Sequence, residues 1–161
     1  YQKQRILTFL NPEHDPLGAG YHIIQSKIAV GSGGFWGSGF MQGTQSQLSF
    51  LPERHTDFAF SVFAEEWGFT GSLILLGLYL FLIIWGIYIA RRASDMFGMM
   101  LALGVTAMIF WHIVVNLGMV IGLLPVVGVP LPLFSYGGTS MVTTMIGTVL
   151  LLNISMRRFM F

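Results

Sequence analysis

The distribution of charged residues is the strongest constraint on how this 161-residue chain folds. No Asp, Glu, Lys or Arg occurs between Met96 and Met156, and a second charge-free run extends from Trp67 to Ala90. A helix of about 20 apolar residues crosses the hydrocarbon core of a bilayer. The shorter run therefore provides one crossing, and the longer run provides two with a loop between them. We predict an all-α integral membrane protein, a polytopic helix bundle with spans at about 67–90, 99–122 and 141–156.

The composition agrees with a membrane protein, since 54% of the residues are hydrophobic and only 9% are charged. The net charge of +1 argues against a nucleic-acid partner, because phosphate binding requires a basic surface. The lack of Cys excludes disulfides, thiolate metal sites and Cys nucleophiles. The chain begins with neither Met nor a signal-peptide pattern, so we expect it to be the C-terminal part of a longer protein.

Residues 1–58 differ in composition from the rest and are predicted to form an extracytoplasmic loop, followed by a membrane domain over residues 59–161. The loop contains turn signals and a Gly-rich stretch at residues 31–43. Tyr21, Ile24 and Ile28 recur at helical spacing in a polar segment, which predicts a short interfacial helix at the membrane surface.

Two arginine pairs predict the orientation in the membrane. Arg91–Arg92 and Arg157–Arg158 flank the spans on one side, which the positive-inside rule makes cytoplasmic. The opening segment and residues 123–140 then share the outer side. Three prolines prevent residues 123–140 from forming one helix. Irregular backbone at membrane depth requires protein or water to satisfy it, so this segment is predicted to be a rigid re-entrant or outer loop.

Ionisable side chains gather at residues 51–58 (Leu-Pro-Glu-Arg-His-Thr-Asp-Phe), just before the first span. Thr56 is predicted as a helix N-cap, which places Asp57 in the first helical turn. There the helix dipole favours a carboxylate while the apolar surroundings oppose it, a combination that suits a general base. On this helix Asp57, Ser61 and Glu65 share a face and are predicted to line an outward-facing cavity. The alternative is that Thr56 and Asp57 only cap the helix.

Other polar residues are weaker candidates. Arg54 and Lys27 suit a phosphate on the outer face, or simply meet lipid headgroups. His112 and Asn116 share a face of the second span, and an interhelical hydrogen bond is the expected role of Asn116. Gly118 and Gly122 have the spacing of close helix packing. No metal-ligand spacing is present.

Motifs along nearly the whole chain resemble the SEDS family of bacterial cell-wall proteins, and its elongation branch (RodA-like) more than its division branch (FtsW-like). The matching segments are residues 11–12, 31–34, 43–47, 51–58, 64–68, 116–120, 122–132 and 135–138. Ser38 departs from the family pattern, which has Lys between the two glycines. RodA-like proteins have ten membrane helices, so the chain corresponds to the outer loop before the eighth helix and the last three helices.

The resemblance implies a peptidoglycan glycosyltransferase that polymerises lipid II on the outer face of the bacterial cytoplasmic (inner) membrane for cell elongation and rod shape. The essential acidic residue of the family falls on Asp57, which would be the catalytic base. The leaving diphosphate needs positive charge from Arg54, Lys27 or a divalent cation, Mg²⁺ or Mn²⁺. The substrate-binding residues expected from the resemblance are Glu53, Arg54, His55, Glu65, Lys27, Ser135 and Tyr136.

The family also implies a class B penicillin-binding protein as transpeptidase partner, together with other membrane proteins of the rod complex. Two other functions remain open. A lipid II flippase would depend on intramembrane polar groups such as His112 and Asn116, whereas a non-catalytic scaffold for a penicillin-binding protein would tolerate the loss of Asp57. The concentration of ionisable groups on the loop favours chemistry over transport.

Overall fold

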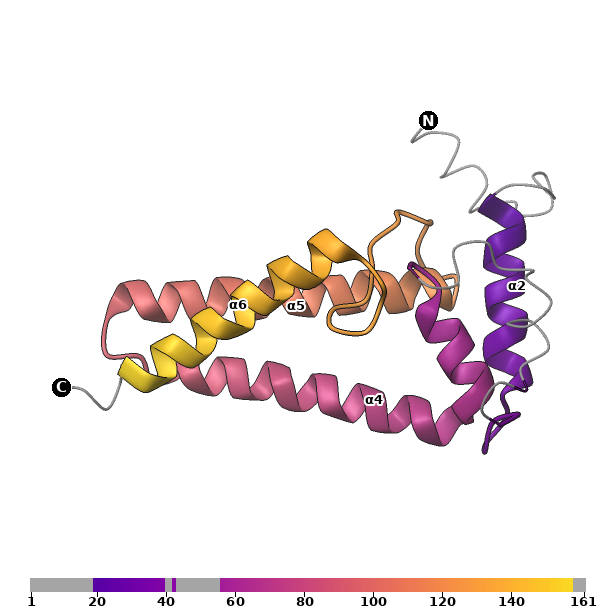
Figure 1. Ribbon diagram of the computed structural model, residues 1–161, viewed down its shortest axis with the longest axis horizontal. Helices are drawn as coiled ribbons and strands as arrows, with labels where there is room; N and C mark the ends of the chain where they lie inside the picture. Colours follow the sequence, from indigo (N-terminus) through magenta and orange to yellow (C-terminus); the bar gives the residue numbers. More distant parts are fainter. Residues whose placement is uncertain (1–18, 40–41, 43–55, 158–161) are drawn as a thin grey trace.

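The computed structural model describes residues 19–39, 42 and 56–157, and this part of the chain is helical without strands. It contains helices α2 (Ala19–Ser32), α4 (Ala59–Arg91), α5 (Met96–Val120) and α6 (Gly138–Arg157) (Figure 1). By length and composition, α4, α5 and α6 are able to cross a membrane. The predicted all-α architecture with three spans is confirmed.

The three long helices form the body of the bundle. Helices α4 and α5 run antiparallel and α6 crosses beside them (Figure 1). The contact between α4 and α5 is close because Gly86 lacks a side chain, and a Cβ there would collide with the Thr106 side chain. A Cβ on Gly147 of α6 would lie 3.0 Å from Val105 Cγ1 of α5. Such small residues let membrane helices approach each other closely.

The outer surface of the bundle suits an apolar environment. Ile74, Leu78 and Phe81 of α4 are 67%, 61% and 66% exposed, although each is large and hydrophobic. A contiguous exposed apolar surface is rare on soluble proteins, whereas in a membrane it contacts lipid or further helices. The chain is a membrane protein.

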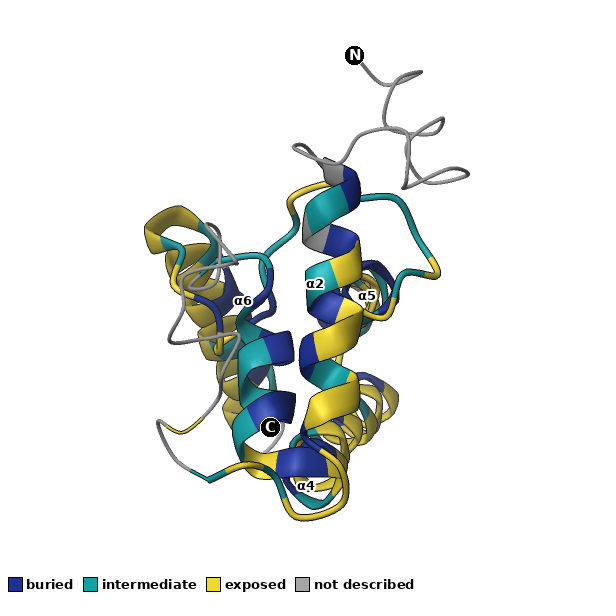
Figure 2. Cartoon of the chain, turned by 90° about the vertical axis from the view of Figure 1, so that its right-hand side faces the viewer, coloured by how far each residue is buried: buried dark blue, intermediate teal, exposed yellow. Residues whose placement is uncertain are grey.

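Helix α2 lies across one end of the bundle (Figures 1 and 2). The helix predicted in this region is present, but Ile24 and Ile28 are exposed, while Ile23, Ser26 and Ala29 form the packed face. The Ser26 hydroxyl donates to the Val120 carbonyl at 2.8 Å, which joins α2 to the end of α5. Figure 2 shows this division of α2 into a buried and an exposed side.

The arginines lie at one end of the bundle, as the predicted orientation requires. The turn after α4, with Arg91 and Arg92, lies at the same end as Arg157 of α6, and α2 lies at the opposite end (Figure 1). We call these the arginine end and the α2 end.

Helix α4 bends at Gly68, where the backbone leaves helical geometry with φ 64° and ψ −161°. In a straight helix the amides of Phe69 and Thr70 would donate to the carbonyls of Glu65 and Glu66. Instead these amides donate to Gly34 and Phe35, at 2.9 and 3.3 Å. The two carbonyls accept from Ser38 and Gly39, at 3.0 and 3.1 Å. The segment 33–39 thus takes over the hydrogen bonds that the bend removes, as a membrane helix requires.

We predict that Gly68→Ala destabilises the fold by at least about 1–3 kcal/mol, because this backbone region is essentially restricted to glycine. A Cβ at Gly68 would also collide with the backbone of Trp36 and Gly37. Gly77→Ala is the matched control, since a Cβ at this α4 position meets nothing within 4 Å. Thermal unfolding of the detergent-purified full-length protein measures both. Equal midpoints for the two variants would contradict the role of Gly68.

Candidate active site around Asp57

Asp57 lies in a turn at residues 56–58, before α4 begins. The prediction that Thr56 caps the helix and places Asp57 in its first turn is wrong. The N-cap is Phe58, with φ −106° and ψ 19°, and it makes no side-chain cap hydrogen bond. Phe58 is 2% exposed, and its carbonyl accepts from the Ser61 hydroxyl at 2.7 Å. The helix therefore begins at Ala59, directly after the buried Phe58.

The Asn116 side chain connects three elements at the α2 end of the bundle. It is fully buried on α5, and its Nδ2 donates to the carbonyl oxygens of Asp57 at 2.9 Å and Val129 at 2.7 Å. One amide thereby ties both the turn that carries Asp57 and the Pro/Gly-rich loop to α5. The expected hydrogen-bonding role of Asn116 is thus found with loop carbonyls as partners rather than another helix. Its Oδ1 is buried without a hydrogen-bond partner in the described part of the chain.

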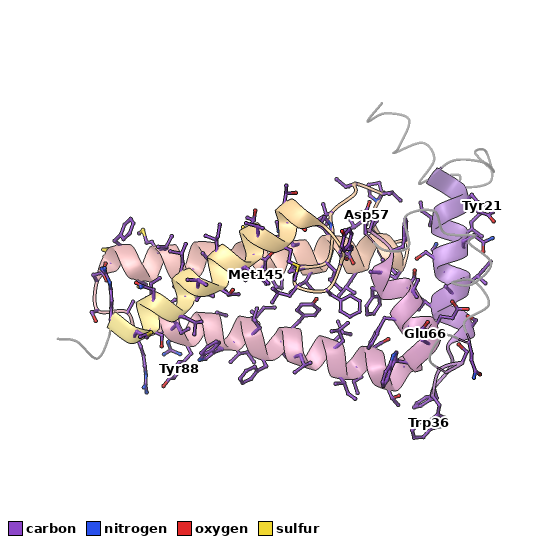
Figure 3. All side chains as sticks on the ribbon, viewed as in Figure 1. Tyr21, Trp36, Asp57, Glu66, Tyr88 and Met145 are labelled. Atoms are coloured by element: carbon purple, nitrogen blue, oxygen red, sulfur yellow. The ribbon has the colours of Figure 1, made fainter. Side chains whose placement is uncertain are left out.

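The Asp57 carboxylate lies beside Gly128. A Cβ on Gly128 would be 3.2 Å from Asp57 Oδ2, and the Gly128 backbone has φ 79°, a conformation that favours glycine. Figure 3 shows Asp57 where the turn before α4 meets the loop. The Asn116 side chain thus holds the backbone of Asp57, and Gly128 leaves room for the Asp57 carboxylate.

The loop between α5 and α6 re-enters the bundle, which decides between the two predicted forms of this segment. Leu131 is 1% exposed, and the Tyr79 hydroxyl of α4 donates to the Pro132 carbonyl at 2.6 Å. Ser135 closes the loop tip, since its Oγ accepts from the Leu131 amide at 2.9 Å and its amide donates to the Leu131 carbonyl at 3.0 Å. Protein groups thus satisfy this irregular backbone, as expected at membrane depth.

The remaining predicted site residues lie in different surroundings. Glu65 is 1% exposed, and its backbone packs against the segment 33–39. Ser135 is buried in the loop, whereas Tyr136 is 81% exposed. Lys27 is exposed on α2, with its side chain against Gly122. Glu53, Arg54 and His55 lie outside the described residues.

The prediction that Asp57, Ser61 and Glu65 share one helix face is correct only for Ser61 and Glu65. Ser61 and Glu65 are both buried on α4, one helical turn apart, whereas Asp57 precedes the helix. A position outside the helix removes the spacing argument that placed Asp57 and Glu65 in one cavity. Ser38, which replaces the expected Lys, donates its hydroxyl to the Glu65 carbonyl at 2.8 Å and so supports the bend of α4.

His112 and the Gly118–Gly122 pair make contacts within or at the end of α5. His112 Nδ1 lies 2.8 Å from the Met108 carbonyl of its own helix. Gly118 and Gly122 belong to the end of α5 rather than to a contact between spans. The amides of Leu123 and Leu124 donate to the Gly118 carbonyl, and Gly122 has φ 72°.

The described residues do not form a recognisable metal site. Among them no group of three or more His, Asp or Glu side chains lies close enough to hold an ion. The expected divalent cation therefore has no ligand set here, and we assign no chemical step to it.

Residues 1–159 match the profile of the cell cycle protein family that comprises FtsW, RodA and SpoVE. The chain belongs to this family. It is 58% identical over 160 residues to the peptidoglycan glycosyltransferase MrdB of Escherichia coli K12, covering 99% of this chain and 43% of MrdB. It is 51% identical to the peptidoglycan glycosyltransferase RodA of Treponema pallidum, covering 98% of this chain and 36% of RodA. The chain thus spans less than half of these relatives.

Solved structures of family members have the same fold. A structure of a peptidoglycan synthase complex matches with a TM-score of 0.79 and 37% identity, covering 99% of this chain and 43% of the matched chain. The crystal structure of the rod shape determining protein RodA of Thermus thermophilus matches with a TM-score of 0.63 and 41% identity, covering 78% and 38%. Identity to a probable FtsW of Trichlorobacter lovleyi is 47%. The resemblance to the SEDS family, and to its RodA-like branch, is confirmed.

Proposed function

We propose that the full-length protein is a peptidoglycan glycosyltransferase that polymerises lipid II into glycan strands for cell elongation and rod shape. The observation that carries this proposal is the 58% identity, over 99% of the chain, to a relative named a peptidoglycan glycosyltransferase. The geometry supports it, since the turn that carries Asp57 is bonded by a buried amide and its carboxylate has room beside Gly128.

Asp57 acts as the general base of the transfer. Its carboxylate accepts the proton of the 4-hydroxyl of the acceptor sugar while that oxygen forms a bond to the anomeric carbon of the donor. The bond from this carbon to the diphosphate breaks on the opposite face, so the anomeric centre inverts. Undecaprenyl diphosphate leaves with the electron pair. General-base catalysis by a positioned group contributes roughly 10²–10⁴-fold to such a rate.

Substrate contacts come from the α2 end of the bundle. Tyr136 is exposed on the re-entrant loop and Lys27 is exposed on α2, so both side chains are available to a bound lipid II molecule. Lys27 and Arg54 supply positive charge to the leaving diphosphate. Glu53 and His55 complete the proposed contacts. Ser135 and Glu65, which are buried, act by holding the loop and the bend of α4.

The protein resides in the bacterial inner membrane, with Asp57 on the outer face. Arg91, Arg92 and Arg157 at the opposite end of the bundle support this orientation, because basic residues beside the spans mark the cytoplasmic side. A class B penicillin-binding protein is the proposed partner. The similarity to a chain in a peptidoglycan synthase complex supports this partnership.

The test is a polymerisation assay with fluorescent lipid II, the full-length protein and its penicillin-binding partner, with a β-lactam present to block crosslinking. We expect glycan strands to accumulate. Movement of labelled lipid II across a vesicle membrane without polymer would identify a flippase instead. Neither product nor movement, from an intact complex, would identify a scaffold. Transport is not favoured by His112 and Asn116 of α5, since His112 bonds its own helix and Asn116 bonds backbone carbonyls.

A further inference from the structure

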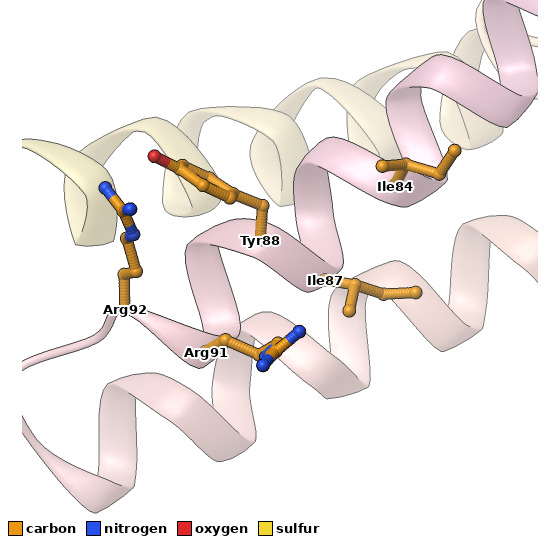
Figure 4. A pocket seen from close by; sticks show the side chains of 5 residues that line it. All are labelled: Ile84, Ile87, Tyr88, Arg91 and Arg92. Atoms are coloured by element: carbon orange, nitrogen blue, oxygen red, sulfur yellow. The ribbon is translucent and has the colours of Figure 1, made fainter.

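A groove of about 480 Å³ lies on α4 at the arginine end (Figure 4). Tyr88, one of its lining residues, lies far along the bundle from Asp57 (Figure 3). The groove is lined by Ile84, Ile87, Tyr88, Arg91 and Arg92. The first four positions have the spacing that places residues on one face of a helix, and Arg92 follows the end of α4. The groove therefore combines apolar side chains of the span with two arginine side chains from the end of α4.

The two arginines are available to an anion. The Arg92 guanidinium carbon lies 4.5 Å from the centre of the Tyr88 ring, a cation–π contact that holds this side chain beside the groove. The nearest carboxylate along the chain, Asp95, caps α5 by accepting from the Gly98 amide at 2.9 Å. Both arginines are exposed. Within the described part of the chain, neither arginine forms a salt bridge.

The apolar wall of the groove is equally accessible. Ile84 and Ile87 are 57% and 42% exposed, and they precede the arginines by about two turns and one turn of α4. A ligand that fits both parts needs an anionic head and a hydrocarbon tail in line with it. Arginine suits the head in particular, because its planar fork donates two hydrogen bonds to one phosphate.

We propose that this groove binds an anionic phospholipid of the leaflet at the arginine end. Its phosphate lies between Arg91 and Arg92, and one acyl chain follows Ile84 and Ile87. Charge complementarity selects this occupant, since two uncompensated guanidiniums at a membrane surface attract anionic headgroups. A zwitterionic headgroup carries its own positive charge, so its electrostatic attraction to the two arginines is weaker.

Native mass spectrometry of the detergent-purified full-length protein tests this site, with dioleoyl phosphatidylglycerol and dioleoyl phosphatidylcholine as probes. We expect selective retention of phosphatidylglycerol. Arg91→Gln and Arg92→Gln should each weaken retention about fivefold, and the double variant about 25-fold. Arg157→Gln is the matched control, because this exposed arginine lies at the same end of the bundle but does not line the groove. It should leave retention unchanged.

Three results would overturn the proposal. Equal retention of the two lipids by the wild-type protein would remove the charge selectivity. An equal loss of phosphatidylglycerol retention in Arg157→Gln would show that the lipid is attracted by the basic end in general and not by this groove. No lipid retained by the wild-type protein would mean that another part of the full-length protein fills the groove. The double variant Arg91→Lys/Arg92→Lys keeps the charge for membrane orientation, and it should retain phosphatidylglycerol less well than the wild-type protein does.

Discussion

Asp57→Asn is expected to lower the initial rate of lipid II polymerisation by about 10²–10⁴-fold, the usual contribution of a positioned general base. The amide has nearly the shape of the carboxylate, so it fits the same space beside Gly128. It does not accept the proton of the acceptor hydroxyl. The rate is measured from the initial formation of glycan product by the full-length protein in its complex with the penicillin-binding protein.

Glu66→Gln is the control for this change, because it makes the same chemical replacement on another carboxylate of α4. Glu66 lies at the bend of α4, away from Asp57 (Figure 3). Glu66 is half-buried, and Glu66→Gln should polymerise lipid II within about twofold of the wild-type rate because the change lies away from the reacting groups. Equal losses in both variants would show that the defect comes from the fold of this region rather than from a missing base.

Asn116→Leu is expected to lower kcat for polymerisation by about 10–100-fold with a smaller change in KM. The substitution removes both hydrogen bonds that tie Asp57 and Val129 to α5. A displacement of about 1 Å in a catalytic group costs on the order of 10²-fold. Both carbonyls are part-buried, and the loss of a hydrogen bond typically costs about 0.5–1.5 kcal/mol, so we expect a lower unfolding midpoint. Steady-state kinetics and thermal unfolding measure the two effects separately.

His112→Leu is the matched control for Asn116→Leu. His112 lies one helical turn earlier on α5, and its Nδ1 forms a hydrogen bond with the Met108 carbonyl of the same helix. We expect near-normal kinetics. A loss of kcat as large as that of Asn116→Leu would show that α5 tolerates no polar-to-apolar change. Normal kinetics for Asn116→Leu beside an inactive Asp57→Asn would remove the positioning role and leave the proposed function intact.

The charge pattern was sufficient to predict the membrane helices. A long run without ionisable residues has few alternatives to a span, because each buried charge costs several kcal/mol at membrane depth. The short helix α2 was also predicted, but its packed face was not. Ile24 and Ile28 suggested that face, whereas Ser26 is buried by its bond to the Val120 carbonyl, a partner 94 residues away.

The bend of α4 could not be predicted from local sequence. Glycine occurs at several positions of α4, and Gly77 remains helical while Gly68 does not. The difference arises because residues 33–39 supply donors and acceptors at Gly68 alone. That supply depends on a tertiary contact between segments about 30 residues apart, which no helical pattern contains.

The sequence predicts Asp57 as the catalytic base, which stays a prediction, but it does not predict the surroundings of this residue. A Thr-Asp pair before an apolar run is typical of a helix N-terminus, so the start of α4 was placed too early. In the structure α4 starts at Ala59, after the buried Phe58. Asn116 was recognised as a buried hydrogen-bonding residue, while its partners depended on where the re-entrant loop lies. Gly128 was part of a recognised motif, and its place beside Asp57 required the fold.

The most direct test of Asp57 as the catalytic base measures lipid II binding and glycosidic bond formation in one preparation of the Asp57→Asn complex. We predict that labelled lipid II is retained at near wild-type affinity while single-turnover bond formation falls by at least about 10²-fold. Bond formation at the wild-type rate would contradict the account, because the carboxylate would then be dispensable for the reaction.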